Sequence, residues 1–345
     1  MEYVGLDVSQ TMTAVCVIDE SGDVVWRGAC SSTPESIAIV LRRRAPNAAG
    51  VGLETGPLSV WLWHALRELG FTVICLHARA AALALKLQAN KTDGNDAYGL
   101  AQIIRSGWYR PVSVKALGSH RLRTALAARA RLIGVQTGIG NQIRGLLKTY
   151  GVVLGIGKGR VFEEQVLARI PEDEEIKPVV TSLLEVWKTA RNQRELLDRR
   201  LERLARRHPV CRRLMTTPGV GCITALAFVA TVDDPCRFQS SRDLGAYLGL
   251  IPRKYQSGDV DRTGSITKCG DQLLRSCLFE AAHVLLHRCP AEMRGSALAE
   301  WGRAVARRTG NRKAKVALAR KLAVVLHRMW VEETTFVARP SEAAA

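Results

Sequence analysis

Short apolar runs separated by polar turns dominate the first part of the chain and predict β-strands. The expected strands are residues 2–8, 13–18, 24–30, 51–54 and 71–76. Helical patterns fall between and after them, at residues 34–44, 58–69 and 95–106. A β-hairpin that opens the chain, followed by alternating strands and helices, indicates an α/β domain with a mixed sheet.

Beyond residue 115 the apolar period lengthens, and the pattern predicts long amphipathic helices. Residues 115–150 and 176–207 form the two long stretches, with a glycine-rich break at 151–159 between them. Such a pair suggests an antiparallel hairpin or coiled coil that serves as an oligomerisation arm, although simple packing inside one domain explains the pattern equally well. A mainly α segment follows. The expected domains are therefore 1–112, 113–208 and 209–335.

Composition places the chain among globular proteins, since 47% of its 345 residues are apolar. No run approaches 18 uninterrupted apolar residues, and no basic-then-apolar leader opens the chain, so we expect a cytoplasmic protein without membrane contact. The nine cysteines include no C-x-x-C pair. This pattern favours reduced thiols and argues against a zinc site.

Charge divides the chain unevenly and changes the functional picture. Residues 1–100 hold 8 Lys and Arg against 10 Asp and Glu, whereas the remainder holds 42 against 22. A basic, soluble surface explains part of this excess, but the net charge of +18 exceeds what solubility needs. We therefore expect a polyanionic partner, with nucleic acid as the best candidate, and a bacterial protein associated with the nucleoid.

Four carboxylates in the acidic part are the candidate catalytic and metal-binding residues. Asp7 and Glu54 each end an apolar run, where a strand delivers its last side chain to a sheet edge, and Asp93 and Asp96 share one face of a helix. Clustered carboxylates raise one another's pKa unless a cation lies between them. Mg²⁺, or Mn²⁺ in its place, is the expected ion. Taken singly, each residue also fits an ordinary cap or turn.

The basic part holds a turn and a polar segment that fit contacts with nucleic acid. Pro218-Gly219-Val220-Gly221 resembles the turn of a helix-hairpin-helix module, in which backbone amides approach a phosphate. Ser257 precedes a glycine among several cations and is a candidate nucleophile, with Ser265 as the second candidate, although a turn residue fits Ser257 better on physical grounds alone. The expected nucleic-acid contacts are Gly219, Gly221, Arg253, Lys254, Arg262, Lys268 and Arg275.

These motifs, in this order, resemble the DEDD transposases of bacterial insertion sequences, described as bridge-RNA-guided recombinases. The N-terminal motifs are Gly5-Leu6-Asp7-Val8, Leu53-Glu54-Thr55-Gly56 and Lys91-Thr92-Asp93-x-x-Asp96-Ala97. The C-terminal motifs are Pro218-Gly219-Val220-Gly221, Tyr247-Leu248-Gly249-Leu250-Ile251-Pro252, Gln256-Ser257-Gly258, Ile266-Thr267-Lys268-x-Gly270-Asp271-x-x-Leu274-Arg275 and Gly310 through Trp330. The resemblance runs from end to end, and its specificity lies in the joint order of the motifs.

The resemblance implies a RuvC-like first domain, a helical region and a transposase domain that carries the serine. Asp7, Glu54, Asp93 and Asp96 would hold Mg²⁺, and Ser257 would form a covalent phosphoserine with DNA before strand exchange. The element ends and the target would be double-stranded DNA. A structured noncoding guide RNA would pair with both, and the arginine-rich helices around 119–148 and 188–213 would contact the RNA backbone. The protein would work as a dimer or tetramer, with the two catalytic parts of one site supplied by different subunits.

Three alternatives stay open at this point. A RuvC-type nuclease or junction resolvase needs the carboxylates and no serine. A non-enzymatic nucleic-acid-binding scaffold needs neither set for chemistry. A kinase-like ATPase with a similar sheet is disfavoured, because no Walker-type glycine loop is present and the basic excess has no role there.

Overall fold

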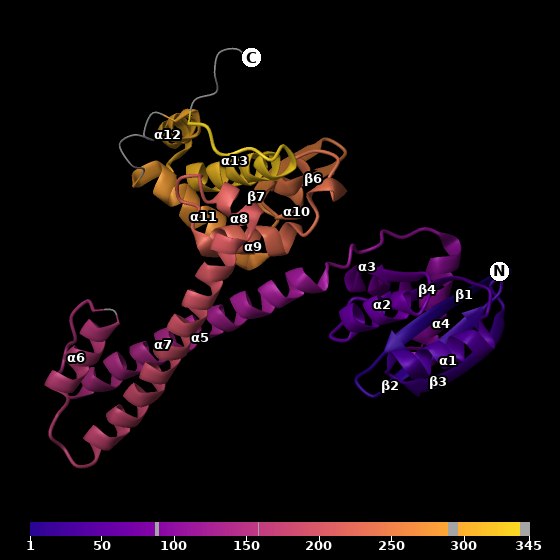
Figure 1. Cartoon of the computed structure of the whole chain (residues 1–345), viewed down its shortest axis with the longest axis horizontal. Helices are drawn as coiled ribbons and strands as arrows, with labels where there is room; N and C mark the ends of the chain where they lie inside the picture. The colour runs from indigo at the N-terminus through magenta and orange to yellow at the C-terminus, as the bar shows by residue number, and fades with distance from the viewer. Residues whose placement is uncertain (87–89, 158, 289–295, 339–345) are drawn as a thin grey trace. The chain divides into compact units, whose positions relative to one another are not determined.

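The computed structural model describes residues 1–86, 90–157, 159–288 and 296–338, and the chain forms two compact units (Figure 1). The units are Met1–Lys115 and Ala116–Ala345. In the part of the chain that the structure describes, no helix is long and apolar enough to cross a membrane. The three domains expected from the sequence are not separated by this division and stay a prediction.

The first unit is built on a mixed sheet of five strands in the order β3-β2-β1-β4-β5. Its strands are β1 (Glu2–Val8), β2 (Met12–Ile18), β3 (Val24–Ser31), β4 (Ala48–Glu54) and β5 (Val73–Leu76). β1 lies in the centre and pairs antiparallel with β2 and parallel with β4. The hairpin and the alternation read from the apolar pattern therefore give the expected α/β domain with a mixed sheet.

Four helices complete the first unit: α1 (Pro34–Arg44), α2 (Ser59–Glu68), α3 (Ala78–Leu85) and α4 (Asp93–Ser106). α1 begins where the Thr33 side chain accepts a hydrogen bond from the Ser36 amide and Pro34 fixes the first turn. Buried leucines and isoleucines of α1 and α2 pack with the valines and leucines of β1 and β4 into one apolar core. The sequence pattern missed α3, since its alanine-rich face carries little contrast.

The second unit begins with two long helices that pack against each other over part of their length. They are α5 (Leu117–Thr149) and α7 (Ile176–Arg207), with the short α6 (Arg160–Arg169) between them in the chain (Figure 1). Phe162 of α6 packs against Trp187 of α7 with ring centroids 4.9 Å apart, and both belong to a small apolar core at this end of the pair. The predicted helical hairpin is confirmed. The short helix α6, which follows the glycine-rich break, was not predicted.

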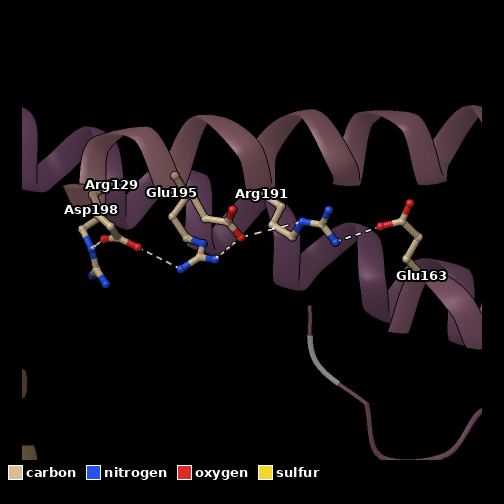
Figure 2. Close-up of polar contacts among 6 residues, drawn as sticks. Arg129, Glu163, Arg191, Glu195 and Asp198 are labelled. Atoms are coloured by element: carbon tan, nitrogen blue, oxygen red, sulfur yellow. Dashed lines mark hydrogen bonds and ion pairs between the residues drawn. The ribbon is translucent and has the colours of Figure 1, made fainter. Parts of the chain in front are cut away.

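A ladder of ion pairs runs along α7 (Figure 2). Arg191 bonds Glu163 of α6 at 2.8 Å, while Asp198 receives Arg129 of α5 at 2.5 Å and Arg194 at 2.9 Å. Glu195 lies between them, 3.8 Å from Arg191. Because these groups are half-buried and connected, they fix the register of the helices more firmly than isolated surface pairs would.

The rest of the second unit is a helical bundle around one large apolar core (Figure 1). Its elements are α8 (Pro209–Leu214), α9 (Cys222–Val232), the 3₁₀ turn η1 (Pro235–Arg237), α10 (Asp243–Tyr247), α11 (Gln272–His287), α12 (Ala297–Thr309) and α13 (Asn311–Val331). α9 is apolar on all sides and buried at nearly every residue, which makes it the central helix of the bundle.

A two-stranded ribbon projects from this bundle and carries the candidate serine. β6 (Pro252–Ser257) and β7 (Val260–Ile266) pair antiparallel, and Ser257 faces Val260 across a loop of two residues. Gly258 adopts φ 54° in that loop, a conformation that favours glycine. The sequence predicted a loop here; the structure shows a hairpin whose residues are exposed on both faces, so no apolar alternation announces it.

Candidate active site

The four candidate carboxylates lie at one edge of the first unit, on the side of the sheet that α4 covers. Leu6 of β1 pairs with Leu53 of β4, so Asp7 and Glu54 are the next residues of two adjacent parallel strands. Side chains alternate along a strand, which puts Asp7 on the same face as Gly5, and Gly5 lies against α4. The predicted delivery of both carboxylates to one sheet edge is confirmed by this register.

Two glycines let α4 approach the sheet closely enough to bring its carboxylates to that edge. A Cβ atom on Gly5 would lie 1.9 Å from the Ala97 carbonyl oxygen, and one on Gly52 would lie 2.5 Å from an Ile104 side-chain carbon. Any larger residue at position 5 would push the helix backbone away. The close approach therefore depends on the sequence Gly5-Leu6-Asp7 as much as on the aspartate.

α4 begins at Asp93 because the Thr92 hydroxyl accepts a hydrogen bond from the Asn95 amide at 3.2 Å. Asp93 and Asp96 thus occupy the first turn, where the helix dipole favours negative charge. The sequence placed the helix start at 95; the structure starts it two residues earlier, at the cap that Thr92 provides. Both carboxylates consequently belong to an ordered turn rather than to a loop.

The carboxylates interact electrostatically. Burial raises the pKa of the Asp7 carboxyl above its ordinary value, and the charges of Asp93 and Asp96 raise it further. Burial also raises the pKa of Glu54, helped by Asp7 and Asp96. Lys91 lowers the pKa of both groups and is a nearby cation that the sequence reasoning did not single out. The site concentrates negative charge that a cation would relieve.

The donor set fits a hard divalent cation in chemistry, since carboxylate oxygens are the ligands that such ions prefer. Among residues 1–86, 90–157, 159–288 and 296–338, no three histidine, cysteine, aspartate or glutamate side chains form a group that could hold a metal ion as they stand. The residues supply the ligands, and their convergence on an ion stays a prediction.

The second candidate group, around the serine, lies in the other unit on the exposed ribbon. Tyr255 and Ser257 are two residues apart on β6, and Tyr255 pairs with Arg262 on β7, so these three side chains share one face. Lys254 lies on the opposite face and forms an ion pair with Asp261 at 3.2 Å. Of the predicted cations, Arg262 is therefore better placed beside Ser257 than Lys254.

Several other predicted contacts have internal partners. Arg275 donates from Nη1 to the Gly270 carbonyl at 2.5 Å and to the Leu248 carbonyl at 3.2 Å, and so it joins two chain turns. Gly219 has φ 82°, and a Cβ there would lie 2.6 Å from the Ala281 carbonyl oxygen, so this glycine packs the turn onto α11. Gly221 faces open space. Arg253 and Lys268 are exposed on the ribbon and just beyond it. Their contacts with nucleic acid stay predictions.

Two family models of known proteins match the chain, one over the carboxylates and one over the serine ribbon. Residues 4–152 match a family model of DEDD transposases of the IS110 type, and residues 211–300 match the Transposase IS116/IS110/IS902 family. The first match contains all four carboxylates, and the second contains the serine ribbon. The chain belongs to this transposase family. The transposase therefore acts on DNA, and its N-terminal unit is the RuvC-like domain that the motif resemblance predicted.

Relatives cover nearly the whole transposase. It is 29% identical to the transposase for insertion sequence element IS1111A of Coxiella burnetii, over 97% of this chain and 91% of the relative. It is 28% identical to the transposase for insertion sequence element IS1328 of Yersinia enterocolitica, over 72% of this chain and 75% of the relative. A pilin gene-inverting protein of Moraxella lacunata is 38% identical over 21% of this chain and 23% of the relative. The family is typically metal-dependent.

Proposed function

We propose that this transposase cleaves and exchanges DNA strands with Ser257 as the nucleophile and with Mg²⁺ held by Asp7, Glu54, Asp93 and Asp96. The observation that carries the proposal is the concentration of these four carboxylates, two at strand ends and two in the first turn of α4. Burial, together with the neighbouring carboxylates, raises the pKa of Asp7 and Glu54, and this supports a site that binds a cation.

Bound Mg²⁺ would withdraw charge from a scissile phosphate and stabilise a leaving oxygen, which four carboxylates cannot do without it. The chain's own residues supply the frame. Gly5 holds α4 against β1, Thr92 fixes the first turn of α4, and Lys91 balances part of the negative charge. Mn²⁺ has the same preference for oxygen ligands and is the expected substitute.

In the proposed step, the Ser257 hydroxyl oxygen forms a bond to a DNA phosphorus while the bond from that phosphorus to the 3′ oxygen breaks. The hydroxyl proton leaves the serine, and the 3′ oxygen ends as a hydroxyl. The product is a phosphoserine joined to the 5′ end of the downstream strand, and the upstream strand ends in the 3′ hydroxyl. Attack by the 3′ hydroxyl of a second strand reverses the chemistry and completes exchange without a free double-strand end. Arg262, on the same face as Ser257, is placed to balance the charge on the phosphate.

A relative's name supports recombination rather than simple cleavage. The Moraxella lacunata protein is named for inverting a pilin gene, and inversion rejoins DNA as well as cutting it. A RuvC-type nuclease would need only the carboxylates, and the serine ribbon would then have no chemical task. The covalent intermediate distinguishes the two proposals.

Replacing Ser257 with alanine is the decisive test. Incubation of the purified transposase with labelled element-end DNA and Mg²⁺ should yield a protein–DNA adduct that survives denaturation, and Ser257→Ala should abolish it. Ser265→Ala is the matched control, since Ser265 lies eight residues away in the same ribbon at its other end, and it should retain the adduct. An adduct that persists in Ser257→Ala and disappears in Ser265→Ala would assign the chemistry to Ser265, and strand cleavage without any adduct would favour the nuclease.

We further propose that a structured guide RNA binds the arm formed by α5 and α7, and that the transposase works as a homo-oligomer. Arg129, Arg191 and Arg194, which lie in the arginine-rich stretches expected to contact RNA, are engaged in ion pairs within the arm. The exposed Arg199, Arg200 and Arg203 near the end of α7 remain as phosphate contacts. Substituting these three with alanine should release RNA that copurifies with the wild-type protein, while substituting Arg129 should destabilise the arm instead.

A further inference from the structure

A cavity of about 910 Å³ lies in the C-terminal bundle between α13, α12 and the root of the β6–β7 ribbon. Five cationic side chains reach its lining: Arg242, Arg312, Lys313, Arg320 and Lys321. Among the residues that the structure describes, no aspartate or glutamate lines it. The cavity therefore presents concentrated positive charge in a concave surface, which attracts an anion more strongly than a flat surface with the same charges.

These five cations lack the carboxylate partners that cations in the helical arm possess. Along α7, arginines are joined to Glu163, Glu195 and Asp198, whereas no ion pair within 4.0 Å forms at any of the five across the described ranges. Lys321 instead lies over the ring of Trp301, with its ammonium 4.2 Å from the ring centroid. Partial burial beside this ring lowers the pKa of the Lys321 ammonium.

The floor of the same cavity is apolar. Leu250, Ile266, Val316 and Val324 line it beside Trp301. A phosphate ion alone would leave this floor without a partner. The ligand that matches the cavity must carry an apolar, planar part and an anionic part a few ångströms apart.

An unpaired nucleotide has this combination, since its base presents two apolar faces and its phosphates carry the charge. A base pair in a duplex does not, because its bases are stacked inside while only the phosphates face the protein. We propose that this cavity binds an unpaired polynucleotide strand, with the base on the Trp301 side of the floor and the flanking phosphates on the cations of α13. Lys321 then leaves the ring for a phosphate, and the ring face becomes available to the base.

The cavity lies at the root of the ribbon that carries the proposed nucleophile, because Ser265 and Ile266 at the end of β7 belong to its wall and Ser257 lies at the other end of the same ribbon. The inference rests on the proposed function in one respect: strand exchange passes through unpaired nucleotides that need a holding site. It is independent of the identity of the nucleophile and of the metal.

Binding measured without metal separates this inference from the recombination chemistry. Fluorescein-labelled 20-nucleotide oligodeoxythymidylate, oligouridylate and a 20-base-pair duplex would be titrated with full-length Ser257→Ala protein in EDTA at several salt concentrations. The cavity variant is Arg312→Ala with Arg320→Ala. The matched control is Arg307→Ala with Arg308→Ala, two exposed arginines of α12 that do not line the cavity.

The cavity variant should bind the single strands at least tenfold more weakly and should lower the salt slope by roughly 1.4, about 0.7 for each lost phosphate contact. The control should change single-strand affinity less than threefold. For the duplex, the cavity variant and the control should lose affinity to the same extent. Trp301→Leu should weaken single-strand binding about tenfold without changing the salt slope, since stacking is not ionic. Lys321→Gln, which leaves the tryptophan in place, should lower both affinity and slope.

Preference for the thymidylate or the uridylate strand would show whether DNA or RNA is the natural occupant, and either result supports the cavity as the site. Wild-type single-strand binding by the cavity variant and by Lys321→Gln would overturn the proposal. Equal losses for single strands and duplex would also overturn it, because the cations would then bind phosphates without regard to unpaired bases. The covalent adduct assay on the chain with Ser257 intact reports separately on the nucleophile.

Discussion

At the scale of single residues, the candidate site places charged carboxylates in partly buried positions. Asp7 and Glu54 end strands whose preceding residues, Leu6 and Leu53, are fully buried, so the sheet holds their carboxylates where water is scarce. The strand ends could be read from the sequence because an apolar run stops at each acid. Lys91 could not, since a lysine in a polar loop has no pattern that marks it as a neighbour of the acids.

Replacing Asp7 with asparagine removes one charge from the repelling group. In EDTA at pH 7.5 this variant should melt at a higher temperature than the wild type, because a raised pKa means that the folded state is stabilised by protonation. That contribution is complete below the ordinary carboxyl pKa and is lost as pH rises through the raised value. The gain should therefore vanish near pH 3. Thermal unfolding followed by circular dichroism measures it.

Added Mg²⁺ should make the wild type more stable than Asp7→Asn. Wild-type protein should gain about 2.7 kcal/mol at one hundred times the Kd of the ion, and Asp7→Asn should gain much less and lose DNA cleavage. Asp23→Asn is the control, since Asp23 is exposed in the turn between β2 and β3 of the same unit. Equal stabilisation of Asp7→Asn and wild type by Mg²⁺ would show that the ion binds elsewhere.

At the scale of elements, the sequence predicted the helices that have an apolar face and missed the ribbon, which has none. Residues 34–44 and 176–207 were bounded correctly, because a Thr-Pro cap starts the first and a strong amphipathic stripe runs through the second. The β6–β7 ribbon was read as a loop because all but one of its residues are exposed. The C-terminal cavity was equally hidden, since its cations come from α10 and α13, far apart in sequence.

The contact between α4 and β1 should be sensitive to a single methyl group. Gly5→Ala should destabilise the first unit by about 1–3 kcal/mol, because a Cβ there overlaps the Ala97 carbonyl oxygen and α4 must shift. The shift should also weaken Mg²⁺ binding by moving Asp93 and Asp96. Gly94→Ala provides a contrast, since nothing lies within 4 Å of its added methyl group. A Gly5→Ala protein as stable as Gly94→Ala would contradict the close approach.

The ion-pair ladder of the arm should show a pH dependence opposite to that of Asp7. Burial alone would raise the pKa of Glu163, but hydrogen bonds from Lys188 and Arg191 outweigh it and lower the pKa. Its stabilising contribution is therefore present above the ordinary value of 4.5 and lost as pH falls through the lowered one.

Glu163→Gln should accordingly lower the melting temperature of the arm at pH 7 and make no difference near pH 2. The control is Glu185→Gln, whose carboxylate is largely exposed and bonds Lys188 alone. A double-mutant cycle of Glu163 with Arg191 should give a coupling of roughly 1 kcal/mol, the upper end for exposed pairs. No coupling would mean that the ladder is only a surface feature.

At the scale of the whole molecule, chemistry and charge are divided between two compact units. The carboxylates belong to Met1–Lys115, and the serine ribbon, the arm and the cationic cavity belong to Ala116–Ala345. Charge counts along the sequence revealed this division, because the basic excess can be counted without knowing the fold. Neither unit alone carries both groups that the proposed recombination needs.

Mixing two inactive proteins tests whether the transposase works as an oligomer whose subunits cooperate. Asp7→Asn and Ser257→Ala should each fail to recombine DNA, and a co-expressed mixture should recover a measurable fraction of wild-type recombination. Recombination of a reporter plasmid, scored by sequencing the junctions, gives the readout. A mixture as inactive as its components would show that each active site draws all its groups from one chain.

The exposure of the β6–β7 ribbon has a consequence for when the proposed nucleophile, Ser257, could react. Two strands that bury almost nothing contribute little free energy of their own, so the serine at their tip is not held in a reactive pose by the fold. In the proposed reaction, its alignment would come from the nucleic acid bound at the ribbon, and the free energy of substrate binding would offset the entropic cost of ordering the ribbon. A wrong or incomplete substrate would then leave the proposed nucleophile unaligned, which would disfavour cleavage at unrelated sites in the host chromosome.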